Sequence, residues 1–290
     1  MRRRTILLAS TAVVALLVAA SVWWLLRPDD APEAAACPYP VVSSEVTSAR
    51  PIGDDRTTIP APSSGALTVT ETGFTQIANK GEVSIGAVVE NTSSQVAYQA
   101  RVIFEAFDAD GSYALGESGR FNYFFEIPIV RPGERAVVGT YAFLNRDSFN
   151  RTGVFITVAR ASLDLVQTQW IPESDTETFP AISARLHPDR PPLAQDGAVT
   201  VHFTANSSAC RELGSRGNMV VFRDTTGGVV GGSYYPSRKE DVCPGGDSTG
   251  RAQVFDSKLP DADLARTEIN VYCDLTPSSH LPAGPTQPVN

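Results

Sequence analysis

The chain contains the same pattern twice, and this repeat limits the fold more than any other feature of the sequence. Residues 65–94 read GALTVTETGFTQIANKGEVSIGAVVENTSS, and residues 180–208 read PAISARLHPDRPPLAQDGAVTVHFTANSS. At a constant offset of 115 positions, and without a gap, Asn91 aligns with Asn206. A unit of roughly 110 residues is too long for a solenoid repeat and about right for a whole domain. The sequence therefore predicts two similar domains in tandem.

Apolar and polar residues alternate within both copies, which is the pattern of β-strands with one buried face. In the first copy, strands are expected near residues 83–89, 100–106, 121–127, 136–143 and 154–165. In the second copy, they are expected at residues 182–186, 199–205, 219–224, 229–235, 251–256 and 268–275. Short strands between turns, with no convincing amphipathic helix, predict an all-β chain of two immunoglobulin-like β-sandwiches, residues 65–170 and 178–276.

An apolar segment at the N-terminus predicts a membrane anchor. Three arginines precede the run from Thr5 to Leu26, which as a helix would be about 33 Å long and could cross a hydrocarbon core of about 30 Å. The positive-inside rule places residues 1–26 as a cytoplasmic tip and transmembrane anchor of a single-pass protein of the cell membrane, with the bulk of the chain outside the cell. The alternative is a signal peptide that is cleaved before secretion.

Two further segments lack any sustained apolar period. Residues 27–64 are rich in Pro, Ser, Ala and Asp and are expected to form an extended stalk, and residues 277–290 are expected to form a disordered tail. The formal net charge of -8, without a long basic cluster beyond the N-terminus, argues against a nucleic-acid partner. Arginine supplies nearly all of the positive charge and, together with abundant Ala, Val, Gly and Pro, suggests a high-GC bacterium. With the predicted export, the expected setting is a bacterial cell envelope.

The four cysteines predict disulfide bonds, because the bulk of the chain is expected outside the cytoplasm and no metal-binding spacing is present. If strands alternate in direction, Cys210 and Cys243 fall at the same end of a sheet, which favours their pairing and leaves Cys37 with Cys273. Three connectivities are possible for four cysteines.

The first copy resembles the FxLYD family of exported β domains. The resemblance rests on Gly86-Ala87-Val88-Val89-Glu90-Asn91, Phe104-Glu105-Ala106-Phe107-Asp108, Gly111 and Pro132-Gly133-Glu134. Ala106 and Phe107 depart mildly from the family pattern, and in the second copy Arg223 takes the aromatic position. The resemblance implies a non-catalytic module of the cell envelope, and it carries no catalytic, cofactor or metal residues. Local hydrogen bonding explains Asp108, and turn formation explains Asn91 and Asn206.

Two motifs allow a chemical interpretation beside a structural one. The segment around Ser248 is similar to the nucleophile loop of chymotrypsin-like proteases, which would make the chain a serine hydrolase, but a serine nucleophile needs a histidine base. His187 and His202 precede it without the sequence context of such a base. Asp108 and Asp110 could serve a calcium loop, although a turn explains them as well. We therefore expect no enzyme activity, no cofactor and no metal site.

One aromatic cluster is the candidate surface for a partner. Phe121, Tyr123 and Phe125 alternate with Phe124, which places aromatic rings on both faces of one strand, and Tyr234 and Tyr235 occupy the corresponding place in the second copy. The second face is either a contact surface or covered by the neighbouring domain. The function expected from the sequence is a membrane-anchored binding or scaffold protein with a protein or cell-wall partner, and a passive structural spacer is a further alternative.

Overall fold

The computed structural model describes residues 65–77, 81–116, 124–145, 155–171, 178–195, 198–237, 242–255 and 261–275. These residues form β-strands and one short 3-10 helix, η6 (Leu264–Arg266), so the prediction of an all-β chain is confirmed for the part that the structure describes. The anchor, the stalk and the tail lie outside the described residues and stay predictions. The described strands belong to one compact unit.

The first copy consists of two three-stranded antiparallel sheets. Sheet I has the order β4-β3-β6, and sheet II has the order β1-β2-β5. The strand bounds are β1 Leu67–Ile77, β2 Glu82–Asn91, β3 Val96–Phe107, β4 Phe124–Val130, β5 Arg135–Phe143 and β6 Arg160–Ile171. The closing strand β6 starts later than the sequence pattern predicted.

The second copy repeats this topology. Sheet III contains β11-β10-β14 with the short β12 beside β10, and sheet IV contains β13-β9-β7 with β8 beside β9. The strand bounds are β7 Ile182–Leu186, β8 Leu193–Gln195, β9 Ala198–Ser207, β10 Leu213–Arg223, β11 Val229–Tyr235, β12 Val242–Cys243, β13 Gly246–Phe255 and β14 Glu268–Asp274.

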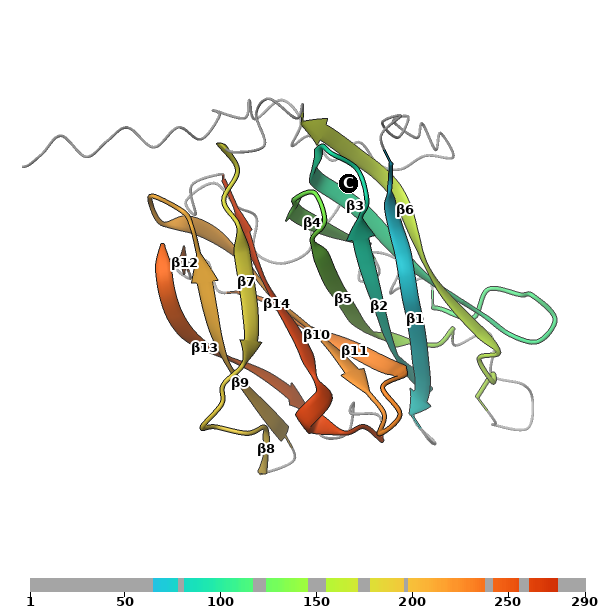
Figure 1. The fold of residues 1–290 in the computed structure, drawn as a ribbon. Helices are drawn as coiled ribbons and strands as arrows, with labels where there is room; N and C mark the ends of the chain where they lie inside the picture. Colours follow the sequence, from blue (N-terminus) through green and yellow to red (C-terminus); the bar gives the residue numbers. More distant parts are fainter. Residues whose placement is uncertain are drawn as a thin grey trace, which may run out of the picture. The chain divides into compact units, whose positions relative to one another are not determined.

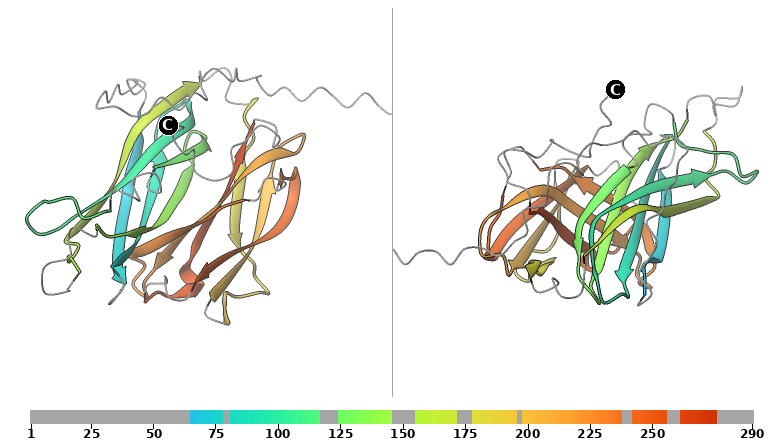
Figure 2. Two further views of the ribbon diagram at one scale, coloured as in Figure 1. Left: turned by 180° about the vertical axis from the view of Figure 1, so that it is seen from behind. Right: turned by 90° about the horizontal axis from the view of Figure 1, so that it is seen from above.

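The four sheets pack face to face in the order I, II, III and IV. Figures 1 and 2 show β11 and β10 of the second copy beside β2 and β5 of the first, and these strands are in contact. One hydrophobic cluster fills the space between sheets I and II, around Ile85 and Phe104, and extends to Met219 and Val221 of β10 and to Tyr272 of β14. The core of the first copy is therefore continuous with residues of the second.

Two smaller clusters complete the interior. Val201, Phe203, Val220 and Phe222 form the centre of the cluster between sheets III and IV. Another cluster joins the copies at one end, where the ring of Tyr98 meets the ring of Phe179 edge to face with centroids 5.5 Å apart. Sheet III is thus covered on both faces, which explains why Met219 to Phe222 are buried without alternation.

The structure corrects the alignment of the two copies by one residue. Leu67 pairs with Asn91, and Ile182 pairs with Ser207. Asn91 and Ser207 also play the same part, since each side-chain oxygen accepts a hydrogen bond from the backbone N–H two residues later. Ser207, and not Asn206, is therefore the counterpart of Asn91. A one-residue shift exchanges the two faces of a strand, which is why Asn91 is buried while Asn206 is exposed.

Glycines allow the backbones of sheets II and III to touch. A Cβ atom on Gly139 of β5 would lie 2.3 Å from the carbonyl oxygen of Val220, and one on Gly86 of β2 would lie 2.2 Å from that of Gly231. Real Cβ atoms do not approach other atoms so closely, and the obstructing atoms belong to the backbone, which cannot rotate away. The contact between the copies therefore depends on the missing side chains.

We expect the substitution Gly139→Ala to destabilise the whole compact unit, because the methyl group forces sheets II and III apart. Overpacking of this kind typically costs about 1–3 kcal/mol, and we expect the upper end of that range because the backbone must move. The free energy of unfolding from urea denaturation measures the effect. Gly228→Ala is the control, because its nearest neighbour is the flexible carboxylate of Asp224 at 3.2 Å. Equal stability of the two variants would contradict the proposed contact.

Candidate functional site

Buried polar contacts fix the position of one copy on the other. The Ser84 hydroxyl of β2 donates to the carbonyl oxygen of Gly232 at 2.9 Å and accepts from its N–H at 2.9 Å. The Tyr272 hydroxyl of β14 donates to the carbonyl oxygen of Val137 at 2.8 Å, and the Asn270 Oδ1 atom accepts from the Val137 N–H at 2.9 Å. Because an unmade hydrogen bond in a buried interface is costly, these contacts select a single relative position of the copies.

A cluster of four charged residues also bridges the copies. Arg223 of β10 contacts Glu71 of β1 and Glu268 of β14, and Arg135 of β5 lies 2.8 Å from Glu71 and 3.9 Å from Glu268. The hydrogen bond from Arg223 lowers the pKa of Glu71, although partial burial acts in the opposite direction. Arg223 therefore has a structural role in the contact between the two copies, which is called the joint below.

A second ion-pair cluster lies towards the other end of β10. Glu126 of β4 contacts Arg101 of β3 at 3.5 Å and Arg216 of β10 at 3.4 Å. The side chains are between 9% and 19% exposed, so the carboxylate is held between two guanidinium groups in a mostly dry setting. Two arginines around one carboxylate supply the pairing that a buried charge requires.

The residues of the predicted aromatic patch do not form one surface among the described residues. Phe125 is buried, and its ring contacts Phe104 and Tyr234 with centroids 5.9 and 5.5 Å away. The Tyr234 hydroxyl donates to the carbonyl oxygen of Arg216, and burial raises the pKa of Tyr234 to about 12. Phe125 and Tyr234 therefore contact each other across the joint. Phe125 lies on the face that packs on Phe104, so whether the opposite face of the strand is a contact surface or is covered by the neighbouring copy stays a prediction.

The remaining residues of the patch contribute less to the joint. Tyr235 is half-buried and packs against the cluster between sheets III and IV. Phe124 belongs to β4, but its side chain lies outside the described residues, as do Phe121 and Tyr123. Their part in partner contact stays a prediction.

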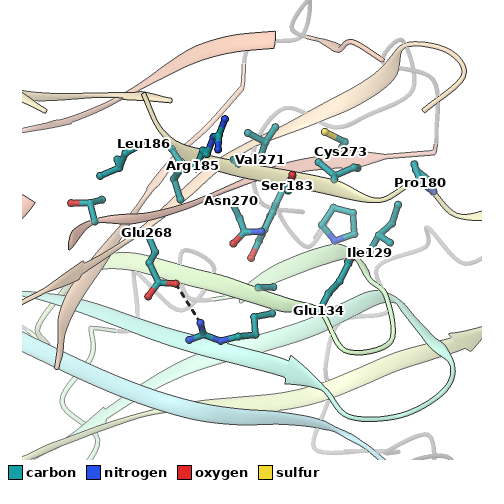
Figure 3. Close-up of a pocket in the computed structure, with 18 residues that line it drawn as sticks. Ile129, Glu134, Pro180, Ser183, Arg185, Leu186, Glu268, Asn270, Val271 and Cys273 are labelled. Atoms are coloured by element: carbon teal, nitrogen blue, oxygen red, sulfur yellow. Dashed lines mark ion pairs between the residues drawn. The ribbon is translucent and has the colours of Figure 1, made fainter. Parts of the chain in front are cut away.

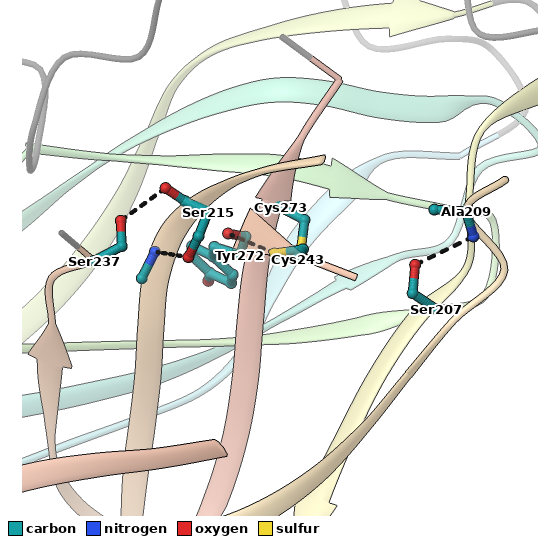
Figure 4. The surroundings of a disulfide bond; sticks show 8 residues. Ser207, Ala209, Ser215, Ser237, Cys243, Tyr272 and Cys273 are labelled. Atoms are coloured by element: carbon teal, nitrogen blue, oxygen red, sulfur yellow. Dashed lines mark hydrogen bonds between the residues drawn. A yellow bond between two sulfur atoms is a disulfide. The ribbon is translucent and has the colours of Figure 1, made fainter. Parts of the chain in front are cut away.

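The disulfide pairing differs from the predicted one. Cys243 of β12 bonds to Cys273 of β14, with Cα atoms 5.9 Å apart (Figure 4). The predicted pairing of Cys210 with Cys243 is therefore wrong, and so is that of Cys273 with Cys37. The reason is that β12 and β14 both pair with the first residues of β10, Leu213 to Ser215, which brings the two cysteines together.

The other two cysteines are placed only in part. Cys210 is exposed in the loop between β9 and β10 and is also disulfide-bonded. Cys37 lies outside the described residues. The prediction that this chain forms disulfide bonds is confirmed by the bond between Cys243 and Cys273.

A groove of about 380 Å³ opens along the edges of the stacked sheets, where the two copies meet. Its walls come from edge strands of all four sheets, namely β4, β5, β14 and β7. In Figure 3, Ser183, Asn270 and Val271 from the second copy face Ile129 and Glu134 from the first. The groove is the candidate binding site, because its shape requires both copies.

Two polar groups of the groove are held in unusual settings. The Glu134 carboxylate accepts a hydrogen bond from the Arg131 N–H at 3.1 Å, and burial raises the pKa of Glu134. The Thr267 hydroxyl is buried, and it has no hydrogen-bond partner within the part of the chain that the structure describes. Buried polar groups without a partner are few in folded proteins, so Thr267 marks this wall of the groove as unusual.

The residues of the hydrolase interpretation do not come together. Ser248 of β13 pairs with Ala205 on the inner face of sheet IV, whereas His202 pairs with Arg251 and lies on the outer face. His187 lies in the turn after β7, where its Nδ1 atom accepts from the Asp189 N–H. His280 is outside the described residues. Ser248 therefore has neither His187 nor His202 as a base in this structure.

The aspartates of the calcium interpretation form a turn. The Asp108 Oδ1 atom accepts from the N–H groups of Asp110 and Ser112, and Asp224 makes the equivalent turn in the second copy. In the described ranges, no group of three or more possible metal ligands occurs.

None of the helices in the described ranges is long and apolar enough to cross a membrane, and the predicted anchor lies outside them.

Comparison with known proteins leaves the family open. No family model matches this chain, and no curated protein does. A transglutaminase from red sea bream aligns with 72% of this chain and 31% of its own, at 11% identity and a TM-score of 0.22. The exo-chitosanase CsxA from Amycolatopsis orientalis aligns with 71% of this chain and 25% of its own, at 12% identity and a TM-score of 0.20. This chain spans less than a third of either structure, and likenesses this low support no functional argument.

Because Glu71 is ionised within the cluster of four charged residues, we expect the folded chain to lose stability in acid. The pKa of Glu71 is lowered in the folded state, so its ionised form stabilises the fold above the unfolded-state pKa of about 4.3. That contribution disappears as the pH falls through the folded-state pKa. We expect Glu71→Gln to flatten the pH dependence of the unfolding free energy below about pH 4. Identical acid limbs for Glu71→Gln and the unmodified protein would contradict this role.

Proposed function

We propose that this chain is a non-catalytic, membrane-anchored protein of the bacterial cell envelope, which binds or scaffolds another envelope component outside the cytoplasm. The observation that carries the proposal is the groove between the copies, because β4 and β5 form one wall while β7 and β14 form the other. Buried hydrogen bonds hold the two walls in one position. A preformed concave surface of this kind favours binding, since little freedom is lost when a partner docks.

The finer parts of the proposal come from the sequence. The copies are immunoglobulin-like β-sandwiches of the FxLYD type, carried on an anchor at Thr5 to Leu26 and a stalk of residues 27–64. The Cys243–Cys273 disulfide agrees with an oxidising compartment, because such bonds persist outside the cytoplasm. The net charge of -8 makes a protein or wall polymer the expected partner rather than nucleic acid.

A passive spacer is the weaker alternative. A spacer needs length and stiffness, but it does not need a groove built from two copies. Removing residues 65–170 is no clean test of a spacer, because sheet III would then expose Met219, Val221 and Tyr272, which the first copy covers. The full-length chain with single substitutions is the better material.

We expect a photo-crosslinking residue at Ser183 to capture the partner in intact cells that carry the full chain, because this position on β7 lines the groove. Gln253 is the matched control, as it is exposed on β13 at the opposite edge of the same sheet. Mass spectrometry of the crosslinked products should identify one component captured from Ser183 and absent from Gln253. The same products from both positions, or none from either, would reject the groove as the binding site.

The hydrolase alternative makes a separate prediction. Because neither His187 nor His202 is positioned as a base for Ser248, we expect the purified chain to remain unlabelled by a fluorophosphonate probe. The variant Ser248→Ala should behave identically. Labelling of the unmodified chain that is lost in Ser248→Ala would establish a serine enzyme and overturn the non-catalytic proposal.

A further inference from the structure

One wall of the groove is a β-strand with a free edge. Strand β7 pairs with β9 along one side only, and no described strand pairs with its other side, which lies at the groove. The ladder continues beyond both ends of β7, since the Ser208 N–H donates to the Ala181 carbonyl and the His187 N–H donates to the His202 carbonyl. Strand β7 is therefore hydrogen-bonded along one side, and its other side is open within the described residues.

The backbone groups that point out of this edge can be identified. In an antiparallel pair, every second residue exchanges hydrogen bonds with its partner, and the residues between them point their N–H and C=O groups the other way. The bonds at Ala181 and His187 place Ser183 and Arg185 in the bonded set. The N–H and C=O groups of Ile182, Ala184 and Leu186 therefore face the groove.

Two other edge strands at the groove, β5 and β4, are blocked from pairing with an added strand. No described group blocks β7 in this way. On β5, the Val137 N–H and C=O groups are already taken by Asn270 and Tyr272 of β14. On β4, Pro128 lines the groove and has no N–H to donate. Edge strands that lack such protection are templates for an added strand.

Arg185 is one of two outward-facing side chains of β7, and its charge has no ion-pair partner among the described residues. Arg185 is exposed, and its Nε atom donates to the Thr204 hydroxyl at 3.4 Å. Across the described ranges it makes no ion pair, whereas Arg135 at the same groove is paired with Glu71 and Glu268. Ala184 and Leu186, beside Arg185 in sequence, face inward and pack against the cluster between sheets III and IV.

We propose that the free edge of β7 binds an extended peptide, with an acidic side chain opposite Arg185 and apolar side chains on both sides of that acid. The peptide adds a strand to sheet IV, and its backbone pairs with Ile182, Ala184 and Leu186. Its acid forms a cross-strand ion pair with Arg185, and its apolar neighbours extend the layer of Ala184 and Leu186. The proposal rests on the binding function proposed above and defines the chemistry of the partner.

The probe is a fluorescein-labelled decapeptide of alternating threonine and valine with one central aspartate, measured by fluorescence anisotropy with the full chain. We expect the substitution Arg185→Glu to weaken binding about tenfold, because an attraction becomes a repulsion. A peptide with arginine in place of the aspartate should reverse the preference and bind the Arg185→Glu chain better. Arg251→Glu is the matched control, because Arg251 is exposed on the outer face of the same sheet but lies on β13.

Hydrogen exchange adds a readout that does not depend on charge. The amides of Ile182, Ala184 and Leu186 should exchange fast in the free chain and become protected when the peptide binds. No peptide binding, equal binding to Arg185→Glu and Arg251→Glu, or unchanged exchange at these amides would overturn the proposal. Protection in the free chain that disappears on dilution would also overturn it, because the edge would then be occupied by a second copy.

These results separate the peptide chemistry from the broader binding function. If the decapeptide fails while crosslinking from Ser183 still captures a specific component, the partner is not an extended peptide but the groove remains a binding site. If both experiments fail, the proposed function fails with the further inference.

Discussion

The close approach of the backbones of sheets II and III is the interaction on which the rest of the structure depends. Gly86 and Gly139 remove the side chains that would keep the sheets apart, and Ser84 then satisfies both polar groups of Gly232 in the dry interface. With the sheets this close, Met219 and Val221 join the core of the first copy. The groove follows from the same contact, because it lies where the edges of the stacked sheets meet. If sheets II and III lay farther apart, neither the contact between the copies nor the groove would form.

The joint also explains why the two copies have diverged. Sheet II corresponds to sheet IV and sheet I to sheet III, so the copies stack head to tail, a mode of contact that can continue without limit. The positions that match Gly86 and Gly139, counted from the Asn91–Ser207 equivalence and the strand pairings, are His202 and Arg251. These bulky polar residues cover the outer face of sheet IV, as polar caps close other stacked repeats. Arg223 of the second copy lies in the joint, where it pairs with Glu71 and Glu268.

Much of the fold could be predicted because its strands obey a local rule. Alternation of apolar residues placed β2, β9 and β11 within a few residues of their observed bounds, and the turn at Asp108 has the hydrogen bonds expected of an aspartate there. Alternation fails where a sheet is covered on both faces, so Met219 to Phe222 gave no sign that sheet III packs on sheet II. The cysteine pairing failed for a related reason, since β12 and β14 both meet the start of β10 and no local pattern records that.

The sequence by itself determined the all-β architecture, the two-fold repetition and the turns, because each depends on residues close together in the chain. Only the tertiary structure decided that Phe125 and Tyr234 contact each other, that Cys243 bonds to Cys273 and that four strand edges surround one groove. Those features depend on which sheet faces which. A glycine weakens the strand that contains it. It allows close packing only where a second backbone lies against it, which the local sequence does not reveal.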